Sequence, residues 1–364
     1  MSSEQKSITS PSITTSSIVT YFHIPPVWIG SDPLVDDVRD KHGDRFERFT
    51  EYVYKRELPQ RIVASVRRDG VFVLDLTNWE PGKPVTIPSV SPRDPPQKQK
   101  DVLAAIEQER DHLARRVEAV NAYLACLYSC KGSPEPVYHI YNSYEHISLR
   151  SLDDKILTAS LNDTYSPLQT FITIHTDFER YISGERARGI LCLDLIKESF
   201  DLYEGLLSCK LNDSLTISVL LLRAANHCAE HDFPSCVIFS WVVCERLINI
   251  LWEGFIDTNR TRTSNGQSVP FINNGRKGRL ENSTAYTAAV KVEFLTFNEM
   301  IPFDLYEDLS ITRKARNEWA HGLKSLDYGA AARAIRVAQA LLGHVAGVHL
   351  HITPGAQARL TMTN

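Results

Sequence analysis

The sequence lacks the signatures of several large classes of protein. It contains no P-loop, no G-x-G-x-x-G and no G-x-S-x-G string, which argues against nucleotide hydrolysis, dinucleotide binding and esterase chemistry. No two of its seven cysteines form a C-x-x-C pair, so we interpret them as reduced, mostly buried thiols. We detect no internal repeat.

Strong charge of either sign is also missing, because the formal net charge is only -4 over 364 residues. Binding to nucleic acid would therefore have to depend on a local basic patch. No apolar run reaches the ~20 residues that a membrane span needs, since Glu245 and Arg246 interrupt the most apolar stretch, Val237 to Trp252. The first residues lack the basic and apolar blocks of a signal peptide. We expect a cytoplasmic protein with no membrane contact.

The N-terminal part mixes strand and helix patterns. We expect a disordered tail over residues 1–17 and an α+β domain of unknown role over residues 18–212. The expected elements are a strand at Ile18–Ile24, a hairpin of Arg61–Val66 and Val71–Leu76 turning at Asp69-Gly70, a surface loop at Pro81–Pro96, a helix at Gln97–Cys130, a strand at Val137–Tyr141 and a helix at Leu191–Leu207.

From residue 213 onward the pattern is almost entirely helical. The sequence predicts helices at Leu215–His231, Ser235–Phe255, Thr284–Phe297, Asp304–His321 and Ser325–Val348. Gly322 is expected to close the fourth of these helices, and Asp327 to lie in the first turn of the fifth. We therefore expect an all-α antiparallel bundle over residues 213–350, followed by a C-terminal tail at 351–364. The fold class predicted for the whole chain is α+β.

The most informative string is Arg316-Asn317-Glu318-Trp319-Ala320-His321, near the end of a helix. A histidine can take the proton of a ribose 2′-OH or give one to the leaving oxygen. An arginine can hold a phosphate oxygen through two donors and stabilise charge in the transition state, and Asn317 can add a hydrogen bond. On a straight helix the two side chains lie roughly 140° apart, and packing against a symmetry mate would help them to converge.

This string resembles the R-x4-H motif of the HEPN superfamily, and Arg316, Asn317 and His321 match it position by position over a region of about residues 213–350. It looks closest to the HEPN domains of bacterial abortive-infection proteins. The resemblance implies a homodimer and metal-independent endoribonuclease activity by transesterification, with no cofactor, in a defence or stress (toxin-like) setting. It also implies that Glu245 supports the site. Asp308 and Thr312 stand where some members carry an acidic and a basic residue, so that variant is not matched.

Two further readings of the same region stay open. Inactive members of the superfamily serve as dimerisation, nucleotide-binding or RNA-binding modules, so the resemblance allows a non-catalytic role. Alternatively, Arg316 and His321 only stabilise the end of their helix, because arginine and protonated histidine interact favourably with the C-terminal end of a helix. For the chain as a whole, we expect a regulatory ligand or protein to act on the N-terminal domain.

A basic segment precedes the motif. Thr258 to Leu280 contains five cations and no acidic residue, and its glycines and asparagines predict a long flexible loop. Such a loop could contact an RNA backbone without reading its sequence; the alternative is a solvated loop that happens to be basic. The candidate RNA-binding residues are Arg260, Arg262, Arg276, Lys277 and Arg279.

A competing metal site is suggested by His227, Glu230 and His231, which spell H-x-x-E-H. Two histidines four residues apart on a helix can share a zinc ion, with the glutamate as base of a metallopeptidase. The string lies at the end of a predicted helix, and no third ligand can be named. We therefore rank this hypothesis below the ribonuclease and expect no bound metal.

Overall fold

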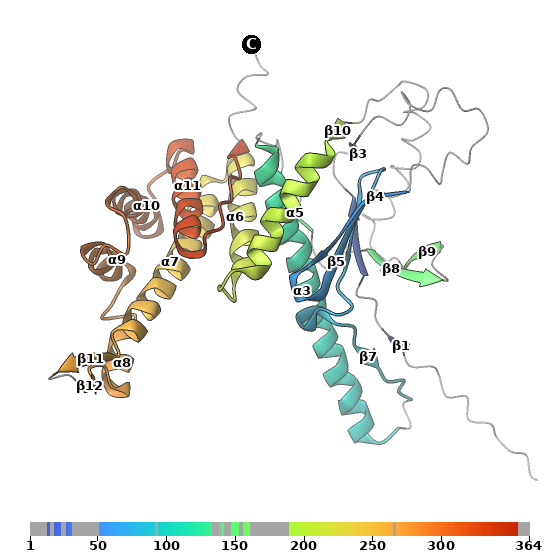
Figure 1. The fold of residues 1–364 in the computed structure, drawn as a ribbon, viewed down its shortest axis with the longest axis horizontal. Coiled ribbons are helices and arrows are strands. Elements are labelled where there is room, and N and C mark those ends of the chain that lie inside the picture. The colour runs from blue at the N-terminus through green and yellow to red at the C-terminus, as the bar shows by residue number, and fades with distance from the viewer. Residues whose placement is uncertain are drawn as a thin grey trace, which may run out of the picture. The chain divides into compact units, whose positions relative to one another are not determined.

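The computed structural model describes residues 13–14, 18–22, 27–30, 51–91, 94–132, 138, 140–141, 147–152, 156–160, 189–264 and 267–355. The chain is mixed α+β, with small sheets toward the N-terminus and a mostly helical C-terminal region, as predicted (Figure 1). It divides into two compact units, Met1–Tyr123 with Tyr141–Phe200, and Leu124–Ile140 with Asp201–Asn364. Two of the chain positions at which the units divide lie inside helices, after Tyr123 and after Phe200.

The main sheet of the N-terminal unit has six strands in the order β4-β5-β6-β2-β8-β9, and every neighbouring pair is antiparallel. The predicted hairpin is confirmed as β5 and β6. At its turn Gly70 has φ of +82°, and an added Cβ would lie 2.6 Å from the carbonyl oxygen of Val27, so the turn requires glycine. The strands are Ile18–Phe22 (β2), Tyr52–Leu58 (β4), Ile62–Arg67 (β5), Val71–Asp75 (β6), Ile147–Leu152 (β8) and Ile156–Ser160 (β9).

Four short strands form two further pairs. Ile13–Thr14 (β1) pairs with Thr86–Ile87 (β7), and Val27–Ile29 (β3) pairs in parallel with Gly189–Leu191 (β10). The predicted loop at Pro81–Pro96 was therefore partly wrong, since it contains β7 and part of a 3-10 turn, Glu80–Gly82. A second 3-10 turn is Pro59–Arg61. Apart from β1, the tail predicted as disordered lies outside the described residues.

Aromatic rings form the core against which the sheet packs. The helix Pro96–Lys131 (α3) supplies Tyr123, whose ring centroid lies 5.5 Å from that of Phe72 on β6 and 4.7 Å from that of Phe200. Phe200 belongs to Leu193–Ser208 (α5), and its ring stacks on that of Tyr54 of β4 at 5.6 Å. Both helices were predicted within a few residues of their observed bounds.

The predicted strand at Val137–Tyr141 was wrong at its described positions. The backbone N–H of Tyr138 donates to Oδ1 of Asn226 at 2.9 Å, and that of Tyr141 donates to Oδ1 of Asn121 at 2.8 Å. Side-chain amides thus take the hydrogen bonds that a neighbouring strand would otherwise supply. Tyr138 and Tyr141 are buried, and the strand-like pattern reflects this burial and not membership of a sheet.

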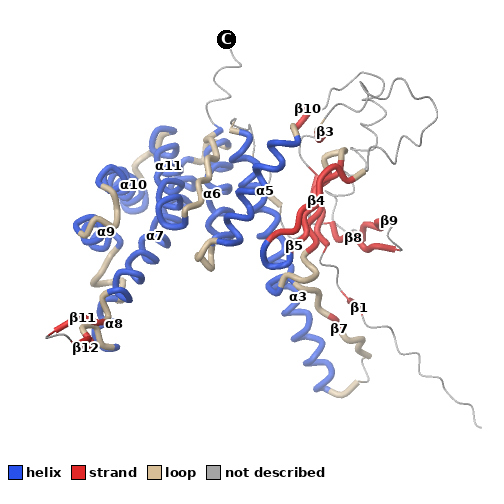
Figure 2. The backbone as a smooth tube through the Cα atoms, in the orientation of Figure 1, coloured by secondary structure: helices blue, strands red, loops and turns tan. Residues whose placement is uncertain are grey.

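The five predicted C-terminal helices are all present (Figure 2). The central one, α7, packs against the other four. Its buried positions recur every three to four residues, from Val237 through Trp241, Cys244 and Ile248 to Trp252 and Ile256. The helices are Ser214–Ala229 (α6), Phe233–Thr258 (α7), Ala288–Phe297 (α9), Phe303–Gly322 (α10) and Tyr328–Ala346 (α11).

Length and hydropathy alone would allow α7 to cross a membrane, and half of its most apolar window is buried in the helical unit. A core helix surrounded by other helices has the same composition. Burial also explains its cysteines, since desolvation raises the pKa of the Cys244 thiol to about 12.

Helix ends are set by specific caps. Asp232 accepts a hydrogen bond from the N–H of Ser235 at the start of α7, and Asp327 accepts one from the N–H of Ala330 at the start of α11. The expectation that Gly322 closes α10 was wrong. Gly322 is the last helical residue, and Leu323 takes the left-handed conformation, with φ of 50°, while its N–H donates to the carbonyl of Trp319 at 2.9 Å.

Replacing Leu323 by glycine should stabilise the protein. A side chain in the left-handed region costs roughly 1–2 kcal/mol, part of which is offset by the greater freedom of glycine in the unfolded chain. We expect Leu323→Gly to raise the free energy of unfolding by about 0.5–1 kcal/mol, measured by urea denaturation at fixed protein concentration. Leu323→Ala is the control and should give no such gain. A decrease with glycine would contradict this explanation of the cap.

Candidate functional site

The predicted catalytic residues all lie on the second half of α10. Arg316 extends the buried side of this helix, because Thr312, Leu309 and Leu305 precede it by one, two and three turns and are buried. Arg316 itself is half-buried, whereas His321 is exposed in the last turn, about 140° around the helix. No hydrogen bond or ion pair joins the two in the part of the chain that the structure describes. One protomer alone does not bring them together.

The guanidinium of Arg316 has N–H donors without a hydrogen-bond partner among the described residues. Its Nη1 donates to Oδ1 of the adjacent Asn317 at 3.0 Å, and its Nε is buried without a hydrogen-bond partner in the described structure. A guanidinium has five N–H donors, and leaving one of them buried and unpaired costs free energy. Such a group has the chemistry to bind a phosphate oxygen. Asn317 orients Arg316 and leaves its own amide N–H groups for a ligand.

Glu245, expected to support the site, lies on α7 and is exposed. It lines a pocket with Asn249 and Lys291, and makes no ion pair with Arg316 among the described residues. Its environment is therefore this pocket. Neither Asn249 nor Lys291 was predicted as a site residue; a lysine inside a mostly apolar helical segment was the available signal.

The basic segment was wrongly predicted to be a long flexible loop. It folds into a hairpin of Thr261–Ser264 (β11) and Gln267–Pro270 (β12), followed by the short helix Asn274–Leu280 (α8). Asn273 caps α8 by accepting a hydrogen bond from the N–H of Arg276 at 2.9 Å. The Asn-Gly pair at 265–266 is a hairpin signal that could have revealed β11 and β12.

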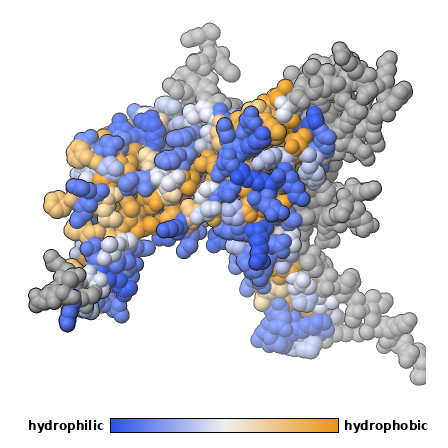
Figure 3. All heavy atoms as spheres, in the orientation of Figure 1, coloured by the Kyte–Doolittle hydropathy of each residue, from blue (hydrophilic) through white to orange (hydrophobic). Residues whose placement is uncertain are grey.

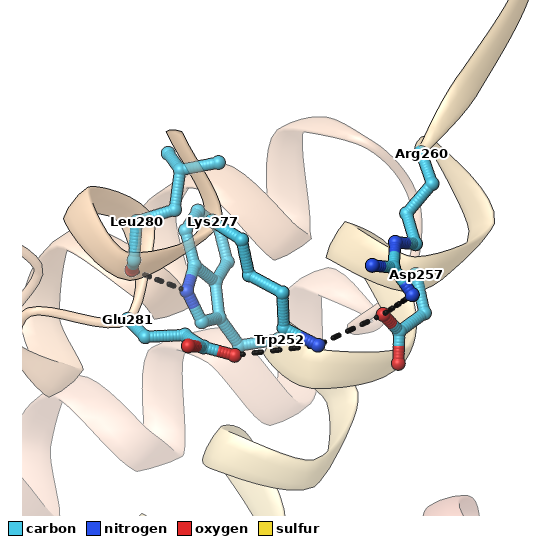
Figure 4. A network of polar contacts seen from close by, with 6 residues as sticks. All are labelled: Trp252, Asp257, Arg260, Lys277, Leu280 and Glu281. Carbon is cyan, nitrogen blue, oxygen red and sulfur yellow. Dashed lines mark hydrogen bonds and ion pairs between the residues drawn. The ribbon is translucent and has the colours of Figure 1, made fainter. Parts of the chain in front are cut away.

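Acidic residues just outside the segment neutralise part of its charge (Figure 4). The ammonium of Lys277 lies 3.1 Å from Oδ1 of Asp257 and 3.5 Å from Oε1 of Glu281. The hydrogen bond to Asp257 holds the pKa of Lys277 above its ordinary value. Arg260 approaches the same Asp257 oxygen at 4.0 Å. Lys277 is thus the ionic link between α7 and α8.

The other cations differ in their environment. The guanidinium of Arg276 lies 4.4 Å above the ring of Phe271 and donates to its carbonyl oxygen at 3.1 Å. Arg279 is exposed, and its side chain has no partner among the described residues. The side chain of Arg262 lies outside the described part of the structure. Arg260, Arg276 and Arg279 are therefore the exposed candidates for contact with RNA among those that the structure describes.

The residues of the competing metal site do not converge. Helix α6 ends at Ala229, and His231 lies beyond it in the left-handed conformation, with φ of 64°. His227 stacks on Phe239 at 5.2 Å and lies 3.2 Å from a carboxylate oxygen of Asp232. Because the helix stops between the two histidines, their helical spacing no longer applies. Over the described ranges, no three His, Cys, Asp or Glu side chains form a group able to hold a metal ion.

No protein-family model, curated protein or solved structure matches this chain. Similarity therefore assigns it neither a family nor an activity. The resemblance of Arg316, Asn317 and His321 to the HEPN motif remains a prediction.

Arg316 should lower the free energy of unfolding if its unpaired N–H donors serve a ligand and not the fold. Arg316→Met keeps the aliphatic stem and removes the buried, unpaired Nε, so we expect the free energy of unfolding to rise by about 1 kcal/mol. Urea denaturation measures the change. The control is Arg313→Met on the same helix, for which we expect a change below about 0.5 kcal/mol. A clear loss of stability in Arg316→Met would instead identify Arg316 as a structural residue.

Proposed function

We propose that the protein is a metal-independent endoribonuclease of the HEPN type. The 2′-oxygen of a ribose attacks the adjacent phosphorus, the bond to the 5′-oxygen breaks, and a 2′,3′-cyclic phosphate forms. His321 accepts the proton of the 2′-OH or donates one to the leaving 5′-oxygen. Arg316 binds the non-bridging oxygens as their charge grows, and Asn317 assists. No cofactor is needed for these steps.

One observation carries the proposal. Arg316 is a half-buried guanidinium whose only partner among the described side chains is its neighbour Asn317, on the helix whose last turn exposes His321. A phosphate group would accept hydrogen bonds from the Nη donors of Arg316 that Asn317 does not use. The exposed position of His321 allows it to exchange protons with a substrate and with solvent.

Two copies of the chain are needed to complete the site. In a two-fold dimer formed through α10, Arg316 of one protomer would face His321 of the partner subunit, because the symmetry repeats the same surface on both sides. Exposed apolar side chains on and beside α9 and α10 supply a surface for this contact (Figure 3). They include Phe297 at 87% exposure, Phe303 at 66%, Ile311 at 47% and Leu323 at 80%.

RNA is the proposed substrate, held through its backbone by the basic segment. Arg260, Arg276 and Arg279 are exposed among the described candidate cations. Arg276 and Arg279 would contribute most, because Arg260 and Lys277 would first have to loosen their pairing with Asp257. The N-terminal unit would bind a regulatory ligand or protein that controls cleavage. Limiting growth by cutting RNA is the defence or stress role that fits such an enzyme.

A non-catalytic binding module is the second candidate. The observation that favours it is the placement of Arg316 and His321 on different sides of α10. In that case the helical unit would dimerise or bind a ligand, and the two residues would not act on one phosphate.

Cleavage of a labelled RNA pool in EDTA tests the proposal. We expect the wild type to leave cyclic-phosphate ends, and Arg316→Ala and His321→Ala each to lower the rate at least about 100-fold. Mixing the two inactive variants tests the composite site. Random exchange makes about half of the dimers mixed, each with one intact site of two, so about a quarter of the wild-type activity should return.

The control is Lys314→Ala, which removes an exposed cation of the same helix and should leave the rate nearly unchanged. No recovery on mixing inactive variants that exchange subunits would place the site within one protomer. A folded, dimeric wild type that leaves the RNA pool uncut would favour the binding module, and full activity in both alanine variants would exclude this pair as the catalytic residues.

A further inference from the structure

A pocket of the helical unit is lined by none of Arg316, Asn317 and His321. It is formed by one side of α7, the segment from Glu281 to Thr287 and the first turns of α9, and has a volume of about 330 Å³. This is within the range of small-ligand sites, roughly 300–1,000 Å³. The size fits one compact molecule.

A buried ammonium forms one wall of the pocket. The side chain of Lys291 is only 6% exposed, and its Nζ donates to Oδ1 of Asn249 at 2.7 Å. An ammonium has three donors, and Asn249 is its only partner among the described residues. The amide N–H groups of Asn249 likewise have no described acceptor. N–H donors that lack an acceptor and border a pocket can bind an oxygen atom of a ligand, so this wall is suited to an acceptor such as a carboxylate.

Carboxylates give the pocket lining negative charge, which exceeds the positive charge of Lys291. Glu245, Glu253 and Glu281 line the pocket, and with Lys291 they give the lining a formal charge of -2. Glu281 is paired with Lys277 at 3.5 Å, whereas Glu245 and Glu253 form no ion pair in the described structure. This balance disfavours a polyanion such as a nucleotide and favours a ligand with surplus positive charge.

Aromatic rings complete the site. The ring of Trp252 lies 5.5 Å from that of Tyr286, and both residues line the pocket. Trp252 is fixed by the hydrogen bond from its Nε1 to the carbonyl of Leu280 at 2.9 Å, beside the Lys277–Glu281 pair (Figure 4). Organic cations bind to the faces of such rings. The pocket is therefore preformed by contacts that no ligand has to create.

We propose that this pocket binds a basic α-amino acid. Its carboxylate accepts from Lys291 and Asn249, and its cationic groups lie near Glu245, Glu253 and the Trp252–Tyr286 rings. The same chemistry occurs in a free basic amino acid and in the basic C-terminal residue of a peptide. The assignment is independent of RNA cleavage, so failure of one leaves the other standing.

Titration calorimetry of the full-length protein with L-arginine tests the assignment. We expect binding, and affinity at least about tenfold weaker for agmatine, which lacks the carboxylate, and for L-citrulline, which lacks the side-chain cation. N-acetyl-L-arginine separates the two sources: retained affinity indicates a peptide C-terminus, and lost affinity a free amino acid. Adenosine monophosphate should not bind.

Variants locate the site. Glu253→Gln and Lys291→Met should each weaken L-arginine binding at least about tenfold, while Glu307→Gln, an exposed glutamate of α10, should leave it unchanged. Glu253 is exposed, so its variant keeps the test valid if Lys291→Met does not fold. No heat of binding with millimolar L-arginine, undiminished binding in Glu253→Gln, or binding of adenosine monophosphate in place of L-arginine would overturn the proposal.

Discussion

The burial of α7 on several sides is the constraint on which the helical unit depends. Because α6, α9, α10 and α11 all pack against it, its sequence is apolar over most of its length. Only a narrow polar strip remains, and Glu245, Asn249 and Glu253 occupy it. The same packing turns the side of α10 that begins at Leu305 inward and leaves His321 outside. The positions of both the Arg316–His321 site and the pocket beside α7 therefore follow from the way the other helices pack on α7.

Helices were the most predictable part of the fold, for a physical reason. The spacing of Val237, Trp241 and Cys244 follows the helical repeat, which is encoded locally. By contrast, Tyr138 owes its conformation to Asn226, far away in the sequence, and local pattern could not show this. Likewise, charge balance in the basic segment depends on Asp257 and Glu281, which lie just outside the stretch that composition singled out.

The candidate catalytic site was only partly predictable. Sequence spacing places Arg316 and His321 on one helix and gives their angular separation, but not which side of α10 is packed. Thr312 and Leu309 decide that point through contacts with other helices. The pocket beside α7 was not foreseen, because Lys291 and Trp252 come together only after α9 folds back against α7.

The boundary between the two compact units has a consequence for synthesis. Each unit is built from two separate stretches of chain, so neither can finish folding as a contiguous nascent segment. Ser129 must wait until residue 351 has left the ribosome before its Oγ can accept the N–H of His351 at 2.6 Å. During that interval the end of α3 lacks its final neighbours, and its apolar side chains are exposed to chaperones. Order of translation therefore matters more for this chain than for one whose units are consecutive.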